Sequence, residues 1–171
     1  MERNNVYKIK GNPMTLVGPE LKVGDTAPDF TALDNDLQPV KFSDSKGKVR
    51  LISVVTSLDT PVCDTQTVTF NQKAAEMGDN IELYTISMDL PFAQKRFCAA
   101  RAVEKLQTLS DYNMASFGEN YGLLIKELRL LARSVLIVDE NDKIAYMQVV
   151  PEGTQEPDYN SALEALKKIV K

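Results

Sequence analysis

Alternating apolar and polar residues mark a β-hairpin near the start of the chain. The alternation runs over 6–9 and again over 14–17, on either side of Gly11-Asn12-Pro13, whose residue types favour a turn. The segment 23–30 reads VGDTAPDF, and its Gly and Pro make it a poor helix or central strand. We therefore expect an N-terminal hairpin followed by an irregular surface segment.

A nearly continuous apolar run further along the chain predicts a buried strand. Residues 49–56 read VRLISVVT and are mostly β-branched or aliphatic after Arg50, which is typical of a strand covered on both faces. A turn follows at 57–61, and 61–77 has the pattern of a helix that Gly78 stops. The order here is strand, turn, helix.

A second strand and helix follow in the same order. Residues 81–88 predict a strand, 91–103 a helix and 106–109 a short strand. Because two strands of one sheet joined by a helix run parallel, this order implies a parallel crossover.

The last third of the chain predicts a hairpin and a final helix. The apolar segments 134–139 and 144–150 flank a Glu-Asn-Asp turn, and an amphipathic helix covers about 157–170. The whole order indicates an α/β, thioredoxin-like fold, with a mixed central sheet flanked by helices and an N-terminal β-hairpin. A length of 171 residues suits one domain spanning 1–171.

Charge and hydropathy exclude several classes of partner. Lys and Arg number 20 and Asp and Glu 24, a net charge of −4 without the basic stripe of a nucleic-acid binder. The apolar runs are far shorter than the roughly 20 residues that a membrane-spanning helix needs. No apolar run follows the charged N-terminal residues as it would in a secretory signal, so we expect a cytoplasmic protein.

The residue types that are missing restrict the chemistry. The chain has no His and only 2 Cys, too few ligands for the usual zinc sites or a His-ligated haem. Neither an EF-hand loop nor a phosphate-binding glycine loop occurs, and we expect no metal and no cofactor. A nucleophile in this chain has to be activated without an imidazole.

Cys63 falls where a helix end can activate it. If the helix begins at Pro61, Thr60 is its N-cap and Cys63 lies in the first turn, where unpaired N–H groups and the helix dipole favour thiolate over thiol. The neighbouring aspartates act against this effect, so we expect the site to recruit a cation. Arg133 is the predicted cation, because an arginine stays charged and presents a fork of donors.

Both cysteines also have an inert interpretation. A free Cys is commonly a small buried hydrophobe, and a Thr three residues before Cys63 is a weak motif, although its place after a strand favours a functional site. Cys98 on its own fits a core position of an amphipathic helix. The separation of 98 minus 63, or 35 residues, excludes a CxxC dithiol and leaves a transient disulfide open.

Several short motifs occur in a fixed order along the chain. They are SLDTPVCD at 57–64, SMDLPFAQ at 87–94, LSD at 109–111, FGENYG at 117–122 and LAR at 131–133. With two cysteines at this separation, they resemble the peroxiredoxins and, more narrowly, the bacterial thiol peroxidases (Tpx), which are atypical two-cysteine peroxiredoxins. The resemblance runs from about Tyr7 to the end of the chain.

The resemblance implies a thioredoxin-dependent thiol peroxidase that serves antioxidant defence. It makes Cys63 the peroxidatic cysteine and Cys98 the resolving cysteine, with Thr60 hydrogen-bonded to the sulfur and the peroxide and Arg133 stabilising the thiolate. Hydrogen peroxide or organic hydroperoxides, with a leaning to the bulkier ones, would convert Cys63 to a sulfenic acid. Condensation with Cys98 would give a disulfide that thioredoxin reduces. The resemblance also implies a homodimer and requires no cofactor.

One position departs from the family, and two rival functions stay open. Peroxiredoxins carry Pro seven residues before the peroxidatic cysteine, where this chain has Thr56. We expect a working enzyme whose rate this change affects. The rivals are a peroxide-sensing protein of the same fold without efficient turnover, and a binding module with inert cysteines.

The disulfide also implies motion. Packed helices lie about 8 to 10 Å apart, whereas bonded cysteines need Cα atoms within about 7 Å. We therefore expect Cys63 and Cys98 to be apart in the reduced protein, and local unwinding of one or both helices to bring them together while the sheet stays fixed.

Overall fold

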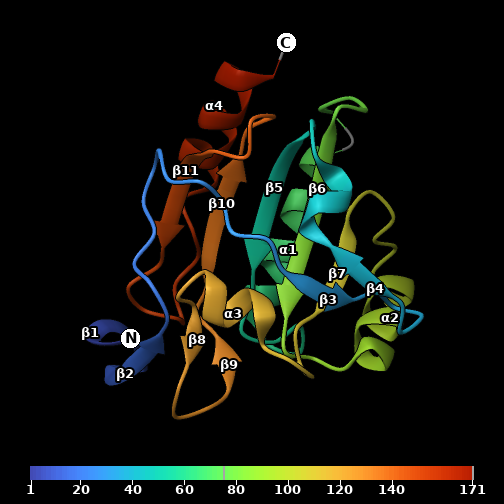
Figure 1. Cartoon of the computed structure of the whole chain (residues 1–171). Coiled ribbons are helices and arrows are strands. Elements are labelled where there is room, and N and C mark those ends of the chain that lie inside the picture. Colours follow the sequence, from blue (N-terminus) through green and yellow to red (C-terminus); the bar gives the residue numbers. More distant parts are fainter. Residues whose placement is uncertain (75, 171) are drawn as a thin grey trace.

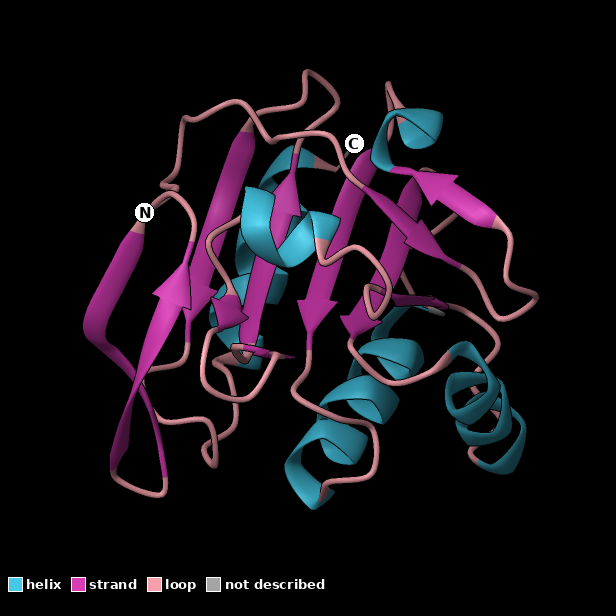
Figure 2. Ribbon diagram, turned by 60° about the horizontal axis from the view of Figure 1, so that its bottom comes forward, coloured by secondary structure: helices cyan, strands magenta, loops and turns pink. Residues whose placement is uncertain are grey.

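A mixed β-sheet forms the centre of the computed structural model, which describes residues 1–74 and 76–170 (Figures 1 and 2). Its strand order is β11-β10-β5-β6-β7-β3-β4, in which β5, β6 and β7 run parallel and the other neighbours antiparallel. The strands are β3 (Thr31–Leu33), β4 (Pro39–Lys41), β5 (Val49–Val54), β6 (Ile81–Ser87), β7 (Gln107–Ser110), β10 (Ser134–Val138) and β11 (Ile144–Val149). The predicted mixed sheet and parallel crossover are confirmed.

Both faces of this sheet are covered. Side chains alternate along β5, so that Val49 and Leu51 face one hydrophobic cluster and Ile52 and Val54 face another. Helices α1 (Pro61–Ala74), α2 (Pro91–Ala100) and α4 (Tyr159–Ile169) contribute to the first cluster, and α3 (Ser116–Asn120) contributes to the second. Figure 2 shows α3 on the opposite side of the sheet from the longer helices. The strand predicted over 49–56 as covered on both faces is confirmed, and it spans Val49–Val54.

The N-terminal hairpin is longer than predicted. It consists of β1 (Glu2–Ile9) and β2 (Asn12–Val17), joined at Lys10 and Gly11, whose φ angles of 51° and 79° suit a two-residue hairpin turn. The turn therefore precedes Pro13, which lies in β2 and pairs with Lys8 of β1. A small second sheet continues the hairpin through β8 (Leu124–Ile125) and β9 (Leu130–Leu131).

Helix ends differ from prediction for local reasons. The helix α2 stops at Ala100, short of the predicted 103, because Ala102 adopts a left-handed φ of 52°. The helix α4 starts at Tyr159, since the Asp158 side chain accepts the Ser161 N–H as its N-cap. The described part of α1 ends at Ala74, and Glu76 already lies in a turn before Gly78. A 3-10 turn at Phe42–Ser45 (η1) was not predicted.

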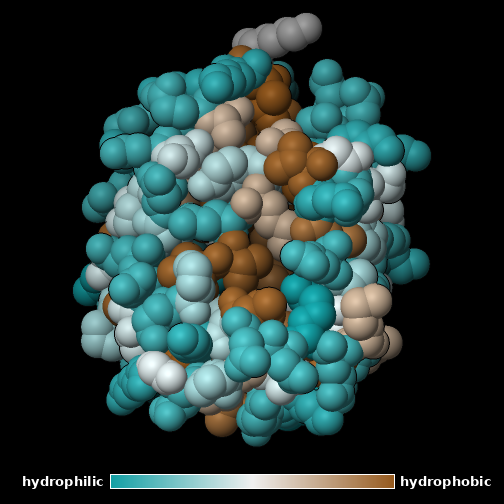
Figure 3. Space-filling view, turned by 90° about the vertical axis from the view of Figure 1, so that its left-hand side faces the viewer, coloured by the Kyte–Doolittle hydropathy of each residue, from teal (hydrophilic) through white to brown (hydrophobic). Residues whose placement is uncertain are grey.

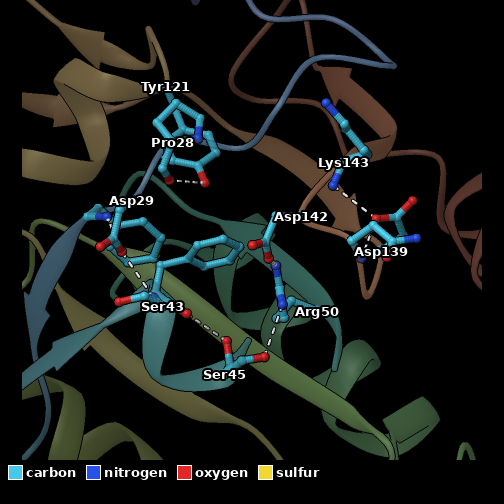
Figure 4. A network of polar contacts seen from close by, with 12 residues as sticks. Pro28, Asp29, Ser43, Ser45, Arg50, Tyr121, Asp139, Asp142 and Lys143 are labelled. Atoms are coloured by element: carbon cyan, nitrogen blue, oxygen red, sulfur yellow. Dashed lines mark hydrogen bonds and ion pairs between the residues drawn. The ribbon is translucent and has the colours of Figure 1, made fainter. Parts of the chain in front are cut away.

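A buried arginine anchors the start of β5, at the end away from the Cys63 loop. Arg50 is fully buried and, as Figure 4 shows, lies between Asp142 and Ser45. Its guanidinium pairs with the Asp142 carboxylate, donates 3.0 Å to the Ser45 carbonyl and lies 4.3 Å from the centre of the Phe42 ring. All three interactions hold β5 against neighbouring segments, so this cluster stabilises the fold at the end of the strand opposite the cysteines.

The face on the side of β1, β2 and β11 carries hydrophobic side chains at its centre, surrounded by hydrophilic ones (Figure 3). A cavity of about 560 Å³ lies there, bordered by Leu16, Leu21 and Met147 among others. Its lining includes neither Cys63 nor Cys98. The size of this cavity therefore gives no reason to place the chemistry in it.

Candidate functional site

Cys63 lies in the first turn of α1, directly after the loop that leaves β5. The Thr60 carbonyl accepts the Asp64 N–H at 2.9 Å, so the first helical hydrogen bond closes around the cysteine. The predicted order of strand, turn and helix is confirmed. The Cys63 side chain is fully buried and packs with Val55 and Leu58, and Phe97 of α2 covers this cluster. The helix end thus acts on a sulfur shielded from water.

Thr60 uses its hydroxyl within the loop. Its Oγ1 donates to the Ser57 carbonyl at 2.9 Å, which fixes the turn before the helix. Among the hydrogen bonds of the described residues, none joins Thr60 to the Cys63 sulfur. The oxygen keeps free lone pairs beside the helix start, and its predicted contact with the sulfur and peroxide stays a prediction.

Arg133 reaches α1 through a buried glutamine. Its Nε donates to the Gly153 carbonyl and its Nη1 to Gln66 Oε1, each at 2.9 Å, while only 2% of the side chain surface is exposed. Gln66 follows Cys63 by three residues and so projects from the same side of the helix. Its Nε2 donates 2.8 Å to Ser53 Oγ on β5. The arginine is therefore held toward the side of α1 that carries Cys63. Its Nη2 takes part in neither the Gly153 nor the Gln66 hydrogen bond.

No sequence pattern marks Gln66 as a site residue. A buried glutamine in a helix looks like an ordinary polar position until Arg133 and Ser53, far away along the chain, meet it. No hydrogen bond or ion pair joins Arg133 to Cys63 among the described residues. The stabilisation of a thiolate by Arg133 therefore stays a prediction.

An ion pair links the start of α1 to the end of α2. Arg101 Nη2 lies 2.9 Å from Asp64 Oδ1, with the two side chains 49% and 32% exposed. A pair this exposed contributes little to stability. Its position nevertheless offsets the negative charge next to Cys63, which the sequence predicts as unfavourable for a thiolate.

Asp89 ties the Cys63 loop to the sheet. Its carboxylate accepts the Ser57 hydroxyl at 2.7 Å, the Leu58 N–H at 2.8 Å and the Ser87 hydroxyl at 2.8 Å. Two of these donors belong to the loop and the third to the end of β6. Because Leu58 packs on Cys63, Asp89 indirectly fixes the wall of the cysteine's pocket. The motif SMDLPFAQ contained this residue, but its role depends on contacts with a remote loop.

Cys98 is half-buried near the end of α2, and neither cysteine is in a disulfide. Its Sγ lies 3.5 Å from the Thr108 hydroxyl of β7, and it packs against the cluster beneath α1, α2 and α4. The preceding residue, Phe97, packs against both that cluster and the Cys63 cluster. Cys98 shares the first of these clusters with Phe97, and of the two residues only Phe97 also packs against the Cys63 cluster.

A buried carboxylate lies at the end of β7. The Asp111 oxygens accept the Phe117 and Gly118 N–H groups at 3.0 and 2.8 Å, which caps the short helix α3. Burial raises the pKa of Asp111 to about 6, although the two N–H donors act in the opposite direction. Phe117 belongs to the hydrophobic core, so the two hydrogen bonds of Asp111 join the end of β7 to that core.

The described part of the chain shows no set of three or more His, Cys, Asp or Glu side chains that would hold a metal ion. None of its helices is long and apolar enough to cross a membrane. The site instead combines a thiol at a helix start, an arginine on the same side of that helix and a second thiol on a neighbouring helix. These groups suit nucleophilic and redox chemistry of sulfur.

The chain is similar to known proteins along nearly all of its length. Residues 22–163 match the Redoxin family. Relatives named thiol peroxidase are 59% identical in Halalkalibacterium halodurans (159 residues, 93% of this chain and 95% of that protein) and 56% identical in Bacillus subtilis (163 residues, 95% and 97%). The crystal structure of a peroxiredoxin-like protein from Aquifex aeolicus is 43% identical, with a TM-score of 0.91 and 98% of both chains covered. The predicted thioredoxin-like fold is confirmed.

Proposed function

We propose a catalytic cycle for this chain on the premise that it belongs to the Redoxin family and is a thiol peroxidase that reduces peroxides. In this cycle Cys63 is the nucleophile. The supporting observation is the position of Cys63 in the first turn of α1, with Arg133 held to the same side of the helix by Gln66. Thr60, at the residue before the helix, orients the incoming peroxide.

The steps balance with the two thiols and an external dithiol. The Cys63 thiolate attacks one peroxide oxygen, the O–O bond breaks, and the other oxygen leaves as water or alcohol after taking a proton. Cys63 is now a sulfenic acid. The Cys98 sulfur attacks it, the S–O bond breaks as the S–S bond forms, and water leaves. A thioredoxin-type dithiol then reduces the Cys63–Cys98 disulfide, and no cofactor takes part.

We propose that disulfide formation involves movement at one or both of the helices that carry the cysteines. Cys63 lies beneath Phe97, whereas Cys98 packs on a different cluster and contacts Thr108. We propose that the end of α2 unwinds so that Phe97 leaves the Cys63 pocket and Cys98 enters it. The oxidised and reduced proteins would then differ around the two cysteines and share the same sheet.

The end of the sheet at which β5, β6 and β7 terminate, called this edge below, carries Cys63 and favours apolar partners. Large apolar side chains are exposed on the segments that follow β6 and β7, namely Leu90 (51%), Phe92 (66%), Tyr112 (40%) and Met114 (64%). We propose that this edge binds organic hydroperoxides and is partly covered in a homodimer of a single-domain cytoplasmic protein. Sedimentation analysis of Phe92→Glu against the parent chain tests the dimer, which the charge is expected to dissociate.

Substitution of each cysteine tests the cycle. Cys63→Ser is expected to abolish peroxide consumption, because a hydroxyl supplies almost no anion near neutral pH. Cys98→Ser is expected to consume about one equivalent and then stop in a thioredoxin-coupled assay, since the disulfide cannot form. Substantial turnover by Cys63→Ser would remove it as the nucleophile, and unchanged turnover by Cys98→Ser would reassign the resolving thiol. A parent chain that stops after one equivalent would instead be a peroxide sensor.

A further inference from the structure

A chain of hydrogen bonds leads from the Cys98 thiol to the turn between β3 and β4. The Thr108 hydroxyl lies 3.5 Å from Cys98 Sγ and donates over 2.8 Å to Asn35 Oδ1. A hydroxyl has a single proton to donate, and here Asn35 accepts it. The Cys98 thiol is therefore the donor to Thr108, and this hydrogen bond exists only while the sulfur keeps its proton.

The β3–β4 turn is built to hold Asn35 in place. Asp34 Oδ1 accepts the N–H groups of Asp36 at 2.8 Å and Gln38 at 2.9 Å, which fixes the turn internally. Asp36 also forms a 2.9 Å ion pair with Lys95 of α2. This pair is exposed and contributes little energy, but it joins the turn to the helix that carries Cys98. A cavity of about 250 Å³ lies between the turn and the cysteine.

We propose that Asn35 and Thr108 are positioning residues that hold Cys98 as a protonated thiol, and that the turn 34–38 holds the end of α2 in place. We call this set of contacts from the turn through Thr108 to Cys98 the latch. The proposal rests on the proposed function, in which Cys98 resolves the Cys63 sulfenic acid. Release of the latch frees Cys98 to move, and its proton leaves with the sulfenic hydroxyl as water. Until then Cys98 is withheld from external oxidants and disulfides.

Alkylation of the reduced protein tests the latch without any peroxide. In a Cys63→Ser background, iodoacetamide at pH 7.5 reports on Cys98 alone. Thr108→Val keeps the shape of the side chain and removes the hydroxyl, so Cys98 is expected to react about threefold to tenfold faster, the factor that a hydrogen bond of ordinary net strength represents. Asn35→Ala is expected to increase the rate as well, because the freed Thr108 proton then stabilises the thiolate. Thr108→Ser restores the hydroxyl and is expected to return the rate toward the parent value.

Thr85 offers a matched control on the neighbouring strand. It pairs with Thr108 in the parallel register of β6 and β7, is 1% exposed, and its Oγ1 has no hydrogen-bond partner among the described residues. Thr85→Val is therefore expected to leave Cys98 reactivity unchanged. Equal rates for Thr108→Val and Thr85→Val, or parent rates for both Thr108→Val and Asn35→Ala, would overturn the latch.

A second measurement follows the latch during turnover. In chains with both cysteines, one equivalent of peroxide is added and the sulfenic acid at Cys63 is trapped with dimedone. Thr108→Val is expected to give less adduct than the parent, because an unlatched Cys98 forms the disulfide sooner. More adduct in that variant would overturn the latch. A parent chain that forms neither the adduct nor the Cys63–Cys98 disulfide would count against the proposed function alone, since the alkylation rates do not depend on it.

Discussion

Substitution of Asp89 tests how the loop that positions Cys63 affects the rate at which this cysteine is oxidised. In Asp89→Ala the Ser57 hydroxyl, the Leu58 N–H and the Ser87 hydroxyl each lose an acceptor at 2.7 to 2.8 Å. Hydrogen bonds to a charged group contribute about 1.5 to 3 kcal/mol each. The two hydroxyls can turn to other acceptors, whereas the Leu58 N–H cannot. We therefore expect a loss of about 2 to 4 kcal/mol, which leaves a domain of ordinary stability folded.

The same change is expected to slow oxidation of Cys63. Leu58 forms part of the wall around the sulfur, and a displacement of about 1 Å near reacting groups costs up to a hundredfold in rate. We expect the single-turnover rate of Cys63 oxidation by peroxide to fall by about tenfold or more. Asp89→Asn keeps one acceptor oxygen and is expected to recover most of both the stability and the rate.

A carboxylate elsewhere in the fold provides the control. Asp139 Oδ1 accepts the N–H groups of Asn141 and Lys143, each at 2.9 Å, in the turn between β10 and β11. Asp139→Ala is expected to lower stability, measured by guanidinium unfolding, without changing the oxidation rate. If Asp89→Ala loses the expected stability yet oxidises within about twofold of the parent rate, Asp89 does not position the nucleophile. Equal rate losses in the two variants would refute the reasoning as well.

Three further predictions concern single side chains. Arg133→Met leaves the Gln66 and Gly153 oxygens without their buried donor, so we expect a loss of about 2 to 4 kcal/mol in guanidinium unfolding and slower alkylation of Cys63, with Arg133→Lys intermediate. Thr56→Pro removes a 3.1 Å hydrogen bond to the Leu131 carbonyl; we expect a cost of about 1 kcal/mol and a higher kcat/KM for peroxide, and an unchanged kcat/KM would show that this position does not limit the rate. Burial raises the pKa of Asp111 from 3.8 to about 6, so its folded-state pKa exceeds the unfolded one and its contribution to stability falls as the pH rises from about 4 to 6. Asp111→Asn is expected to remove that fall from unfolding curves measured across this range, and a parallel pH profile would contradict it.

The elements that the sequence predicts correctly are those with a self-contained pattern. The strands β5 and β6 are rich in β-branched and other apolar residues, and α4 has a helical apolar face, because each is long enough to show its pattern. The missed strands β3 and β8 have three and two residues, too few to show any period. Each pairs with the next strand of the chain and also with a remote strand, as Leu33 does with Pro39 and with Ser110. The second sheet was missed for the same reason.

In the candidate site too, the features that depend on neighbouring residues could be predicted, and those that depend on remote residues could not. The positions of Cys63 and Thr60 could be predicted from the sequence, because the start of a helix depends on neighbouring residues. The structure places both residues at the start of α1. The support of Arg133 by Gln66, and of the Cys63 loop by Asp89, depends on side chains that meet only in the folded chain. No local rule connects such residues. Family motifs contained Asp89 and Arg133, but not what either of them contacts.

Two buried glutamines are expected to limit the proposed unwinding of α1 and α2. Gln66, three residues after Cys63, is pinned to Ser53 and Arg133. Gln94, four residues before Cys98, donates to Ser87 Oγ at 3.0 Å and to the Leu109 carbonyl at 2.9 Å. Breaking either set leaves buried polar groups unpaired, which costs more than fraying the helical turn beyond it. We therefore expect the proposed opening to be confined to the first turn of α1 and the last turns of α2, the two stretches that carry the cysteines. We therefore expect the two thiols to approach each other without release of either helix from the sheet.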